Sequence, residues 1–205
     1  MAQPLSLSCP LPLDVTDRVL LGHGSGGKLS AALLSDIFFR AFTSPLLARM
    51  EDQAVFEIGG TRLAFTTDSF VVKPLFFRGG DIGSLAVHGT VNDLAMGGAE
   101  PLFLSAGFIL EEGLEMNTLR RVAESMARAA QATGAEIVTG DTKVVEKGSG
   151  DGLFINTTGI GVVREGVNLS AANARPGDRV IVSGTLGDHG IAILSEREGI
   201  GFDSP

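Results

Sequence analysis

Clustered glycines divide this chain into short segments, and they constrain its fold more than any other feature. Glycine supplies 28 of the 205 residues, about twice the usual share for a globular protein. The clusters at residues 22–27, 79–80 and 97–98 indicate either tight turns or backbone that lies close to a ligand. For each cluster taken alone, the sequence leaves both interpretations open.

The segments between the glycines have the hydrophobic periods of helices and strands. We expect strands at residues 18–21, 54–58, 61–67, 102–110, 136–139 and 153–163, and helices at residues 28–42, 82–96 and 117–133. Asp81 is the expected N-cap of the second helix, and Gly97 is its expected stop. This order predicts an α+β fold in which helices cover a sheet.

A second domain is expected to begin at residue 165. Residues 165–177 have the composition of a linker, and a strand at 179–183, a second glycine-rich turn and a helix at 189–198 follow. One strand and one helix cannot bury a core by themselves. We therefore expect residues 1–164 to form an N-terminal domain and residues 165–205 to be the truncated beginning of a C-terminal domain.

Composition excludes several classes of function. The formal net charge of −8 argues against broad binding to nucleic acid or to anionic membranes. No apolar run reaches the length of a membrane span, and residues 1–14 lack the basic residues of a signal peptide. We therefore expect a cytoplasmic protein.

The cysteine and the histidines exclude further chemistry. The single cysteine, Cys9, permits neither an internal disulfide nor a cysteine-based zinc site. The three histidines do not have the HExxH spacing of a zinc protease. Nothing in the sequence supports a serine or cysteine hydrolase.

The first glycine cluster is a candidate anion-binding loop. Residues 22–28 read GHGSGGK and fit both the P-loop spacing and the dinucleotide fingerprint. However, Leu29 replaces the Ser or Thr of a P-loop, and no strand ending in an acidic residue follows at the dinucleotide spacing. What remains is a loop whose backbone N–H groups converge on an anion, with Lys28 adding charge at a helix N-terminus. The competing interpretation is a flexible loop.

Asp93 is a candidate metal ligand within the second helix. We expect this helix to be buried, and it places Asp93 beside His88 and Asn92. A carboxylate in such surroundings needs a cation or hydrogen bonds to compensate its charge. A metal ion and an internal salt bridge are both open interpretations.

Asp68 and Asp141 follow the ends of expected strands, where ligand sites often form. Together with Asp93 they could supply oxygen ligands for Mg²⁺. Lys143 shares a face with Asp141 if this segment is extended, and it could neutralise phosphate charge or move a proton. The alternative is that these aspartates only cap turns.

Six segments resemble the HypE family of hydrogenase maturation proteins in their order and spacing. They are residues 22–28, 66–69, 79–83, 86–96, 140–145 and 187–190, which read GHGSGGK, TTDS, GGDIG, AVHGTVNDLAM, GDTKVV and GDHG. This family belongs to the superfamily of aminoimidazole ribonucleotide synthetase and selenophosphate synthetase. The resemblance covers essentially the whole chain, and the run at residues 86–96 is highly specific.

The resemblance implies a fold. The N-terminal domain would have a mixed sheet covered by helices, as in aminoimidazole ribonucleotide synthetase. That sheet would pair with its twin to form a barrel across a homodimer, with ATP and Mg²⁺ near the interface. The C-terminal domain would be of the α/β class.

The resemblance also implies a reaction, carbamoyl dehydration. The carbamoyltransferase HypF would load a carbamoyl group onto a C-terminal cysteine thiol. ATP would phosphorylate the carboxamide oxygen, and proton removal from the nitrogen would then leave a thiocyanate. The cyanide would pass to iron on the HypC–HypD scaffold, as a ligand for nickel–iron hydrogenase.

Single residues receive roles from the same resemblance. Asp68, Asp93 and Asp141 would be ligands of Mg²⁺ or of phosphate. Lys143 and Asp93 would be catalytic, with Lys143 assisting activation or proton transfer. The nucleotide would be held by Gly24, Gly26, Gly27, Lys28 and Asn92.

One departure limits what the resemblance implies. The family's acceptor cysteine lies at the extreme C-terminus of a longer chain, whereas this sequence ends at Pro205 and Cys9 cannot take that role. We therefore expect the 205 residues to dimerise and to bind ATP weakly, but to form no thiocyanate on their own. The alternatives are a non-catalytic nucleotide-binding scaffold and another enzyme of the superfamily, such as a selenophosphate synthetase or a thiamine monophosphate kinase. Selenophosphate synthetases usually carry Cys or selenocysteine in the first glycine-rich loop, and this loop has neither.

Overall fold

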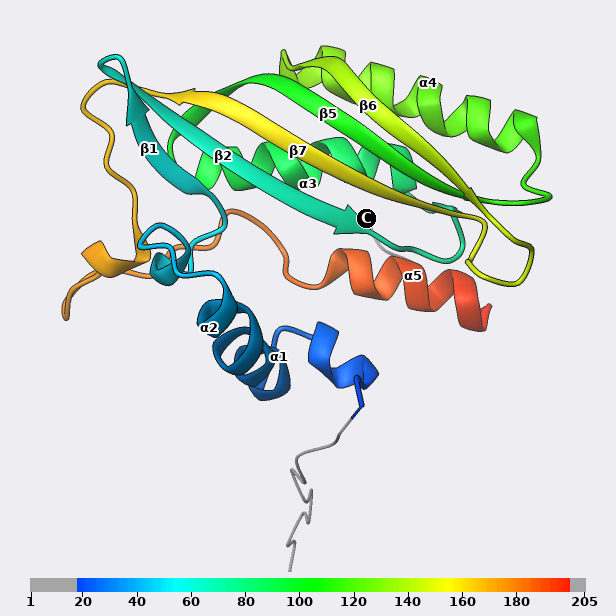
Figure 1. Cartoon of the computed structure of the whole chain (residues 1–205), viewed down its shortest axis with the longest axis horizontal. Helices are drawn as coiled ribbons and strands as arrows, with labels where there is room; N and C mark the ends of the chain where they lie inside the picture. Colours follow the sequence, from blue (N-terminus) through cyan, green and yellow to red (C-terminus); the bar gives the residue numbers. More distant parts are fainter. Residues whose placement is uncertain (1–17, 200–205) are drawn as a thin grey trace, which may run out of the picture. The chain divides into compact units, whose positions relative to one another are not determined.

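The computed structural model describes residues 18–199. The chain separates into two compact units, one up to Ala48 and the other from Arg49 onward, and the short 3₁₀ helix η3 (Leu47–Arg49) lies at their junction. The second unit contains the sheet (Figure 1). None of the helices between residues 18 and 199 is both long and apolar enough to cross a membrane.

The regular structure described in the first unit is all helical. The 3₁₀ helix η1 (Leu21–Gly24) precedes a continuous helical segment of α1 (Lys28–Leu33), the π-helical turn η2 (Leu34–Phe38) and α2 (Phe39–Ala41). This segment confirms the helix predicted at residues 28–42. The strand predicted at residues 18–21 is wrong, because the Leu20 amide and carbonyl bond to His23 and close a turn.

The second unit is built on a five-stranded mixed sheet in the order β1-β2-β7-β5-β6. The strands are β1 (Ala54–Ile58), β2 (Thr61–Phe70), β5 (Ala99–Glu111), β6 (Glu136–Val145) and β7 (Leu153–Val163). The β5–β6 pair of this sheet is parallel, because α4 (Met116–Thr133) returns the chain between the two strands. Helices α3 (Ile82–Met96) and α4 cover one face of the sheet (Figure 1). The predicted α+β fold, a mixed sheet covered by helices, is confirmed.

Three strands, β2, β5 and β6, are longer than the sequence predicted, and the extensions of β2 and β6 bear on the site. β2 continues to Phe70 because it pairs with β7, and β6 continues to Val145 because it follows β5. The prediction that Asp68 and Asp141 follow strand ends is therefore wrong, since both lie inside paired strands.

α3 begins and ends where the sequence predicted. A hairpin of β3 (Phe76–Phe77) and β4 (Gly80–Asp81) leads into it. The Asp81 carboxylate accepts hydrogen bonds from two first-turn amides, at 2.8 and 3.1 Å, and Gly97 is the C-cap. The expectation that this helix is buried is wrong for one side. Because the sheet covers only one face of the helix, His88 and Asn92 on the other side are exposed.

α3 packs closely on β7. The buried hydroxyl oxygens of Thr90 and Thr157 lie 2.5 Å apart, and the Thr157 hydroxyl donates to the Ala86 carbonyl at 3.0 Å. Beside them, a Cβ placed on Gly159 would lie 2.8 Å from Thr90 Cγ2. A larger residue would push the helix off the strand, so this glycine sets their separation.

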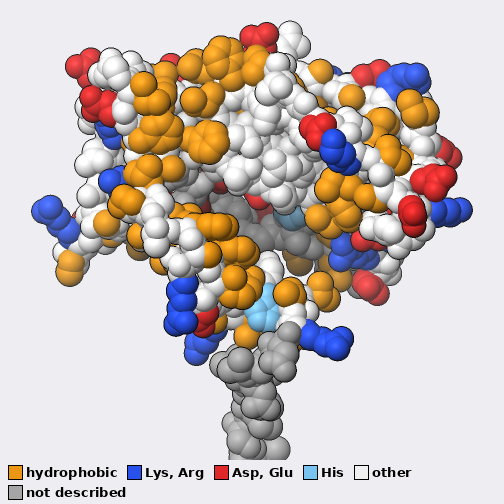
Figure 2. Space-filling model, viewed as in Figure 1, with side chains coloured by type: hydrophobic (Ala, Val, Ile, Leu, Met, Phe, Trp, Pro, Cys, Tyr) orange, Lys and Arg blue, Asp and Glu red, His pale blue; other side chains and the backbone are white. Residues whose placement is uncertain are grey.

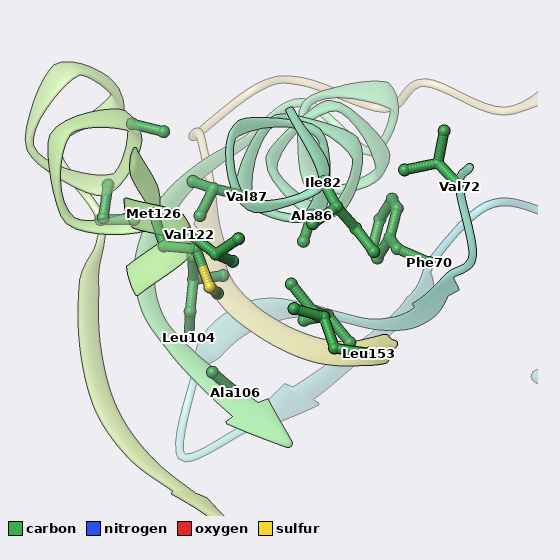
Figure 3. Close-up of a cluster of buried hydrophobic side chains, with 14 of the residues drawn as sticks. Phe70, Val72, Ile82, Ala86, Val87, Leu104, Ala106, Val122, Met126 and Leu153 are labelled. Carbon is green, nitrogen blue, oxygen red and sulfur yellow. The ribbon is translucent and has the colours of Figure 1, made fainter. Parts of the chain in front are cut away.

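The core lies between these two helices and the sheet. Figure 3 shows Ile82, Ala86 and Val87 of α3 and Val122 and Met126 of α4 meeting Leu104, Ala106 and Leu153 of the sheet, with Phe70 and Val72 beside them. Each fully buried aliphatic side chain of this kind contributes roughly 1.5–3 kcal/mol to folding. The cluster therefore fixes α3 and α4 against β5 and β7.

The chain after β7 has less regular structure than the sequence predicted. The strand predicted at residues 179–183 is wrong, because no strand among residues 18–199 pairs with it. Val180 and Ile181 within it are 95% and 87% exposed. The described elements after β7 are the short helix η4 (Ala171–Asn173) and α5 (Asp188–Glu198).

α5 confirms the helix predicted at residues 189–198. Its Ile193 is buried in the core cluster, and Arg197 Nε donates to the Lys73 carbonyl at 2.6 Å. The domain boundary after residue 164 stays a prediction.

Gly83 tests the contact between α3 and α4. A Cβ on Gly83 would lie 2.6 Å from the Val122 carbonyl oxygen, so Gly83→Ala should lower the free energy of unfolding by roughly 1–3 kcal/mol through overpacking. The control is Gly190→Ala in α5, where nothing lies within 4 Å of the added Cβ. It should leave stability unchanged or raise it by up to about 1 kcal/mol. Urea unfolding followed by circular dichroism measures both, and equal effects would contradict the packing described.

Candidate functional site

Two aspartates that the sequence singled out lie together between β2 and α3. Thr66 and Asp68 occupy alternate positions of β2, so both point to the side of the sheet that α3 covers. Thr66 Oγ1 lies 3.0 Å from Asp93 Oδ2 on α3. Gly89 of α3 makes room for Asp68, whose Oδ2 lies 3.7 Å from the position of a Cβ on that glycine.

A third carboxylate, Asp52, joins them from the segment before β1. Its backbone carbonyl oxygen lies 2.8 Å from Thr66 Oγ1, and its charge acts on Asp93. The neighbouring Gln53 is buried, and in the amide orientation that satisfies both its oxygen and its nitrogen, the nitrogen donates to the Asp93 carbonyl at 3.0 Å. This fixes the segment to α3. We call Asp52, Asp68, Asp93 and Thr66 the carboxylate cluster.

Within the cluster, the ionised form of Asp93 is disfavoured. Burial raises the pKa of the Asp93 carboxyl above its ordinary value; the Thr66 hydrogen bond opposes this, and the charges of Asp52 and Asp68 add to it. The Thr66 hydroxyl has one proton and two acceptors, the Asp52 carbonyl and Asp93. It cannot satisfy both at once, so the cluster favours a proton or a cation at Asp93.

The chemistry of the cluster fits a hard divalent cation. Carboxylate oxygens are the ligands that Mg²⁺ prefers in proteins, and this ion completes its shell with water and phosphate oxygens. Within residues 18–199, no three acidic, cysteine or histidine side chains converge closely enough to hold a metal ion by themselves. The described residues of the cluster therefore do not by themselves form a metal site enclosed by protein.

Asp141 and Lys143 form an ion pair on β6, at the edge of the sheet. Lys143 Nζ lies 3.2 Å from Asp141 Oδ2. The hydrogen bond from Lys143, the Thr142 amide and the lysine charge hold the pKa of Asp141 below its usual value. Both side chains are about 70% exposed, so the lysine remains accessible to a ligand.

A pocket of about 430 Å³ lies beside this ion pair. It is lined by Ser69, Phe70, Val71, Gly107, Phe108, Ile109, Asp141, Lys143, Phe154, Ile155 and Asn156. Leu104 and Ala106 of β5 point into the core, so Gly107 and Ile109 belong largely to the opposite, open face of the sheet. The pocket therefore opens on the face that α3 and α4 leave uncovered.

The three predicted metal ligands fall on the two faces of the sheet. The structure brings Asp68 and Asp93 together in the carboxylate cluster, whereas Asp141 lies with Lys143 beside the pocket. Asn92 lies on the exposed side of α3 next to Asp93. The metal, nucleotide and catalytic roles of these residues stay predictions.

The predicted anion-binding loop belongs to the first unit. Gly24, Gly27 and Lys28 are exposed, and Gly27 is the N-cap of α1. The Gly26 amide donates to Ser30 Oγ at 2.9 Å. One of the expected phosphate-binding N–H groups is therefore already used within the loop.

The sequence-based prediction did not include Asp52, Thr66 or Asn156. Thr66 carries a usable signal, because it lies two residues before Asp68 and must share its face in a strand. Asn156 of β7 lines the pocket, and its Nδ2 donates to the Asp68 carbonyl at 2.9 Å. Asp52 carries no local signal, because its place in the cluster depends on the packing of the segment before β1 against α3.

The chain matches a known family and longer relatives. Residues 50–163 match the family described as AIR synthase related protein, N-terminal domain. The protein of Cupriavidus necator named carbamoyl dehydratase HypE is 53% identical over 206 residues. The match covers 100% of this chain and 59% of that protein.

Two solved structures are also similar. A crystal structure of a HypE–HypF complex matches with a TM-score of 0.79 and 57% identity, over 85% of this chain and 56% of that chain. A structure of hydrogenase maturation protein HypE in complex with ATP matches with a TM-score of 0.68 and 55% identity, over 90% and 55%. The chain thus spans little more than half the length of these relatives.

Asp93→Asn tests the electrostatics of the carboxylate cluster. Because the pKa of Asp93 is raised on folding, the folded protein holds this proton more tightly than the unfolded chain does, and stability is lost as the pH rises above the ordinary value of 3.8. Between about pH 4 and pH 7, the free energy of unfolding of the wild type should therefore fall relative to that of Asp93→Asn.

Urea titrations without divalent cations measure this difference across the pH range. Asp36→Asn is the control, because it removes an exposed aspartate of the first unit. If the free energy of unfolding of the wild type instead rose relative to that of Asp93→Asn as the pH increased, the raised pKa of Asp93 would be contradicted.

Proposed function

We propose that this chain, which belongs to the family of AIR synthase related proteins through that family's N-terminal domain, is the ATP-handling portion of a carbamoyl dehydratase. The observation that carries the proposal is the carboxylate cluster, whose charge favours a cation beside Asp93. Relatives named carbamoyl dehydratase HypE support the reaction, and the HypE structure with ATP supports the nucleotide.

The proposed substrate is a carbamoyl group carried on a cysteine sulfur. Phosphorylation of the carboxamide oxygen by ATP turns that oxygen into a leaving group. The nitrogen gives up its two protons, the oxygen departs with phosphate, and an S–C≡N group remains as the source of the cyanide ligand of nickel–iron hydrogenases. Because the relatives extend beyond the matched region, the reaction is proposed for a protein of their full length, and the 205 residues alone are expected to form no thiocyanate.

Asp68 and Asp93 are the proposed ligands of one Mg²⁺ ion, and Asp141, on the opposite face of the sheet beside Lys143, is the proposed ligand of a separate cation. In the carboxylate cluster a cation can take the place of the proton that the raised pKa of Asp93 favours. Bound Mg²⁺ would neutralise phosphate charge. The chain's own contribution is to hold Asp93 and Asp68 at a fixed separation, with Thr66 orienting Asp93.

The proposed nucleotide-binding residues lie in two separate parts of the chain, the glycine loop of the first unit and α3 of the second. Exposed glycine amides and the Lys28 ammonium group donate to phosphate oxygens. Asn92 lies on the exposed side of α3, where it can donate to the same ligand that Asp93 serves. The proposed set is Gly24, Gly26, Gly27, Lys28 and Asn92, and within it the Gly26 amide must leave Ser30 Oγ before it can donate to a phosphate.

Lys143 and Asp93 are the proposed catalytic residues. The Lys143 ammonium group lies beside the pocket and is paired with Asp141. A charged lysine there stabilises negative charge that develops on the carboxamide oxygen. Asp93, whose carboxyl has a pKa raised by burial, would hold or move a proton when no cation occupies the carboxylate cluster.

The open face of the sheet is proposed to pair with that of a second copy, forming a dimeric barrel. Its exposed large apolar side chains are Ile58, Phe65, Val71, Phe103 and Ile109. Figure 2 shows hydrophobic side chains gathered over the end of the sheet that contains β1. The other proposed partners are HypF, which a relative binds in a crystal structure, and the HypC–HypD scaffold, in the cytoplasm.

Magnesium-dependent ATP binding tests the proposed role of Asp93. Asp93→Asn should weaken ATP binding in the presence of Mg²⁺ by about tenfold or more, because one ligand of the cation loses its charge. Isothermal titration calorimetry with Mg²⁺ and with a chelator measures the difference. Glu124→Gln, which removes a charge from an exposed position of α4, is the control. Unchanged binding by Asp93→Asn would exclude Asp93 as a ligand.

The oligomeric state tests the proposed dimer. Phe65 is 43% exposed on the open face, and Phe65→Asp should convert the dimer to a monomer, since a charge buried in an apolar interface costs several kcal/mol. Sedimentation velocity measures this. Met116→Asp, at an exposed position on the helical side, should remain dimeric. A monomeric wild type, or a dimeric Phe65→Asp variant, would contradict the proposal.

A further inference from the structure

The loop between β6 and β7, residues 146–152, has fixed contacts although its sequence is rich in glycine. It reads EKGSGDG, and Gly148 and Gly152 adopt φ angles of 87° and 89°. Glycine gives a loop little conformational preference of its own. Its shape must therefore come from contacts with the rest of the unit.

Glu111, the last residue of β5, supplies these contacts. Its Oε1 accepts a hydrogen bond from the Gly148 amide at 2.6 Å, and its Oε2 accepts one from the Gly152 amide at 2.8 Å. The Glu111 amide donates to the Gly152 carbonyl at 2.8 Å. The two bonds to the carboxylate hold the pKa of Glu111 below its ordinary value, so the group stays charged as an acceptor at neutral pH.

Glu111 is connected to Lys143 through the edge strand. In the β5–β6 register, Glu111 pairs with Val145, two residues beyond Lys143. The Glu112 amide donates to the Val145 carbonyl at 2.9 Å. β6 pairs only with β5 among the described strands, so the position of its last residues depends on β5 and on the loop that follows.

The loop also supports the wall of the pocket. A Cβ on Gly150 would lie 3.6 Å from Phe154 Cε2 and 3.8 Å from Glu111 Cβ. Phe154 lines the pocket beside Lys143. A second anchor holds the far end of the loop, where Lys73 Nζ lies 2.9 Å from Asp151 Oδ1.

We propose that Glu111 is a positioning residue, whose carboxylate clamps the β6–β7 loop and thereby holds Lys143 and Phe154 in place at the pocket. This inference rests on the proposed function of Lys143. Without the clamp the loop opens and the end of β6 frays, so the Lys143 ammonium group spends less time beside the pocket. Glu111 itself does not touch the reacting atoms.

Hydrogen exchange tests the clamp without any assay of activity. Glu111→Gln keeps the shape of the side chain, but its amide nitrogen cannot accept a hydrogen bond. Exchange at the Gly148 or Gly152 amide and at residues 143–145 should become about tenfold faster or more. Glu112→Gln, at the adjacent glutamate, should exchange like the wild type. Equal exchange in the two variants would overturn the inference.

Kinetics of the full-length enzyme test the link to Lys143. Glu111→Gln should lower kcat for thiocyanate formation about tenfold and leave the KM for ATP within about twofold, whereas Glu112→Gln should behave like the wild type. In a Lys143→Met background, Glu111→Gln should cause no further loss, because both changes act through one group. A full additional loss in the double variant would overturn the inference.

The two possible failures have different signatures. Wild-type turnover by Lys143→Met would remove the proposed function of the lysine, and the inference with it. A large loss in Lys143→Met, together with equal rates in Glu111→Gln and Glu112→Gln, would leave the proposed function intact and overturn the role of Glu111 alone.

Discussion

The close packing of α3 on β7 is the constraint on which the candidate site depends. Gly159 allows the helix to approach the strand, and the buried Thr90 and Thr157 hydroxyls hold it there through a chain of hydrogen bonds that ends at a helix carbonyl. Since β2 is the neighbour of β7 in the sheet, this contact also sets the distance from Asp93 to Thr66. A displacement of the helix by one ångström would break that 3.0 Å contact.

The sheet separates two environments of different charge. On the helical side, burial and neighbouring carboxylates make the ionised form of Asp93 costly. On the open side, Asp141 is compensated by Lys143 next to a largely apolar pocket. In the proposed function, the first environment suits a cation with phosphate, and the second suits a small carboxamide that must exchange protons.

The sequence predicts the ends of elements that carry local signals. It does not predict the ends of strands that depend on pairing with a neighbouring strand. α3 has its N-cap at Asp81 and its stop at Gly97, so both ends could be predicted. The ends of β2 and β6 could not, because the strands beside them determine how far each ladder continues. Residues 179–183 have the composition of a strand, but a strand also needs a neighbour. In the site, the candidacy of Asp68 and Asp93 followed from the sequence, whereas the contribution of Asp52 depends on tertiary packing that no local pattern encodes.

The position of β6 at the edge of the sheet has a consequence for handling the protein. An edge strand exposes backbone groups that can template pairing with another chain, and charged side chains on the strand suppress this. β6 carries exposed Val138 and Val144, with the Asp141–Lys143 pair at intervening positions. The same two charges that border the pocket therefore also act as gatekeepers against aggregation. If a substitution of Lys143 reduces the yield of protein, the cause would be aggregation rather than lost activity. Activity should therefore be measured only on the soluble, monodisperse fraction of the variant.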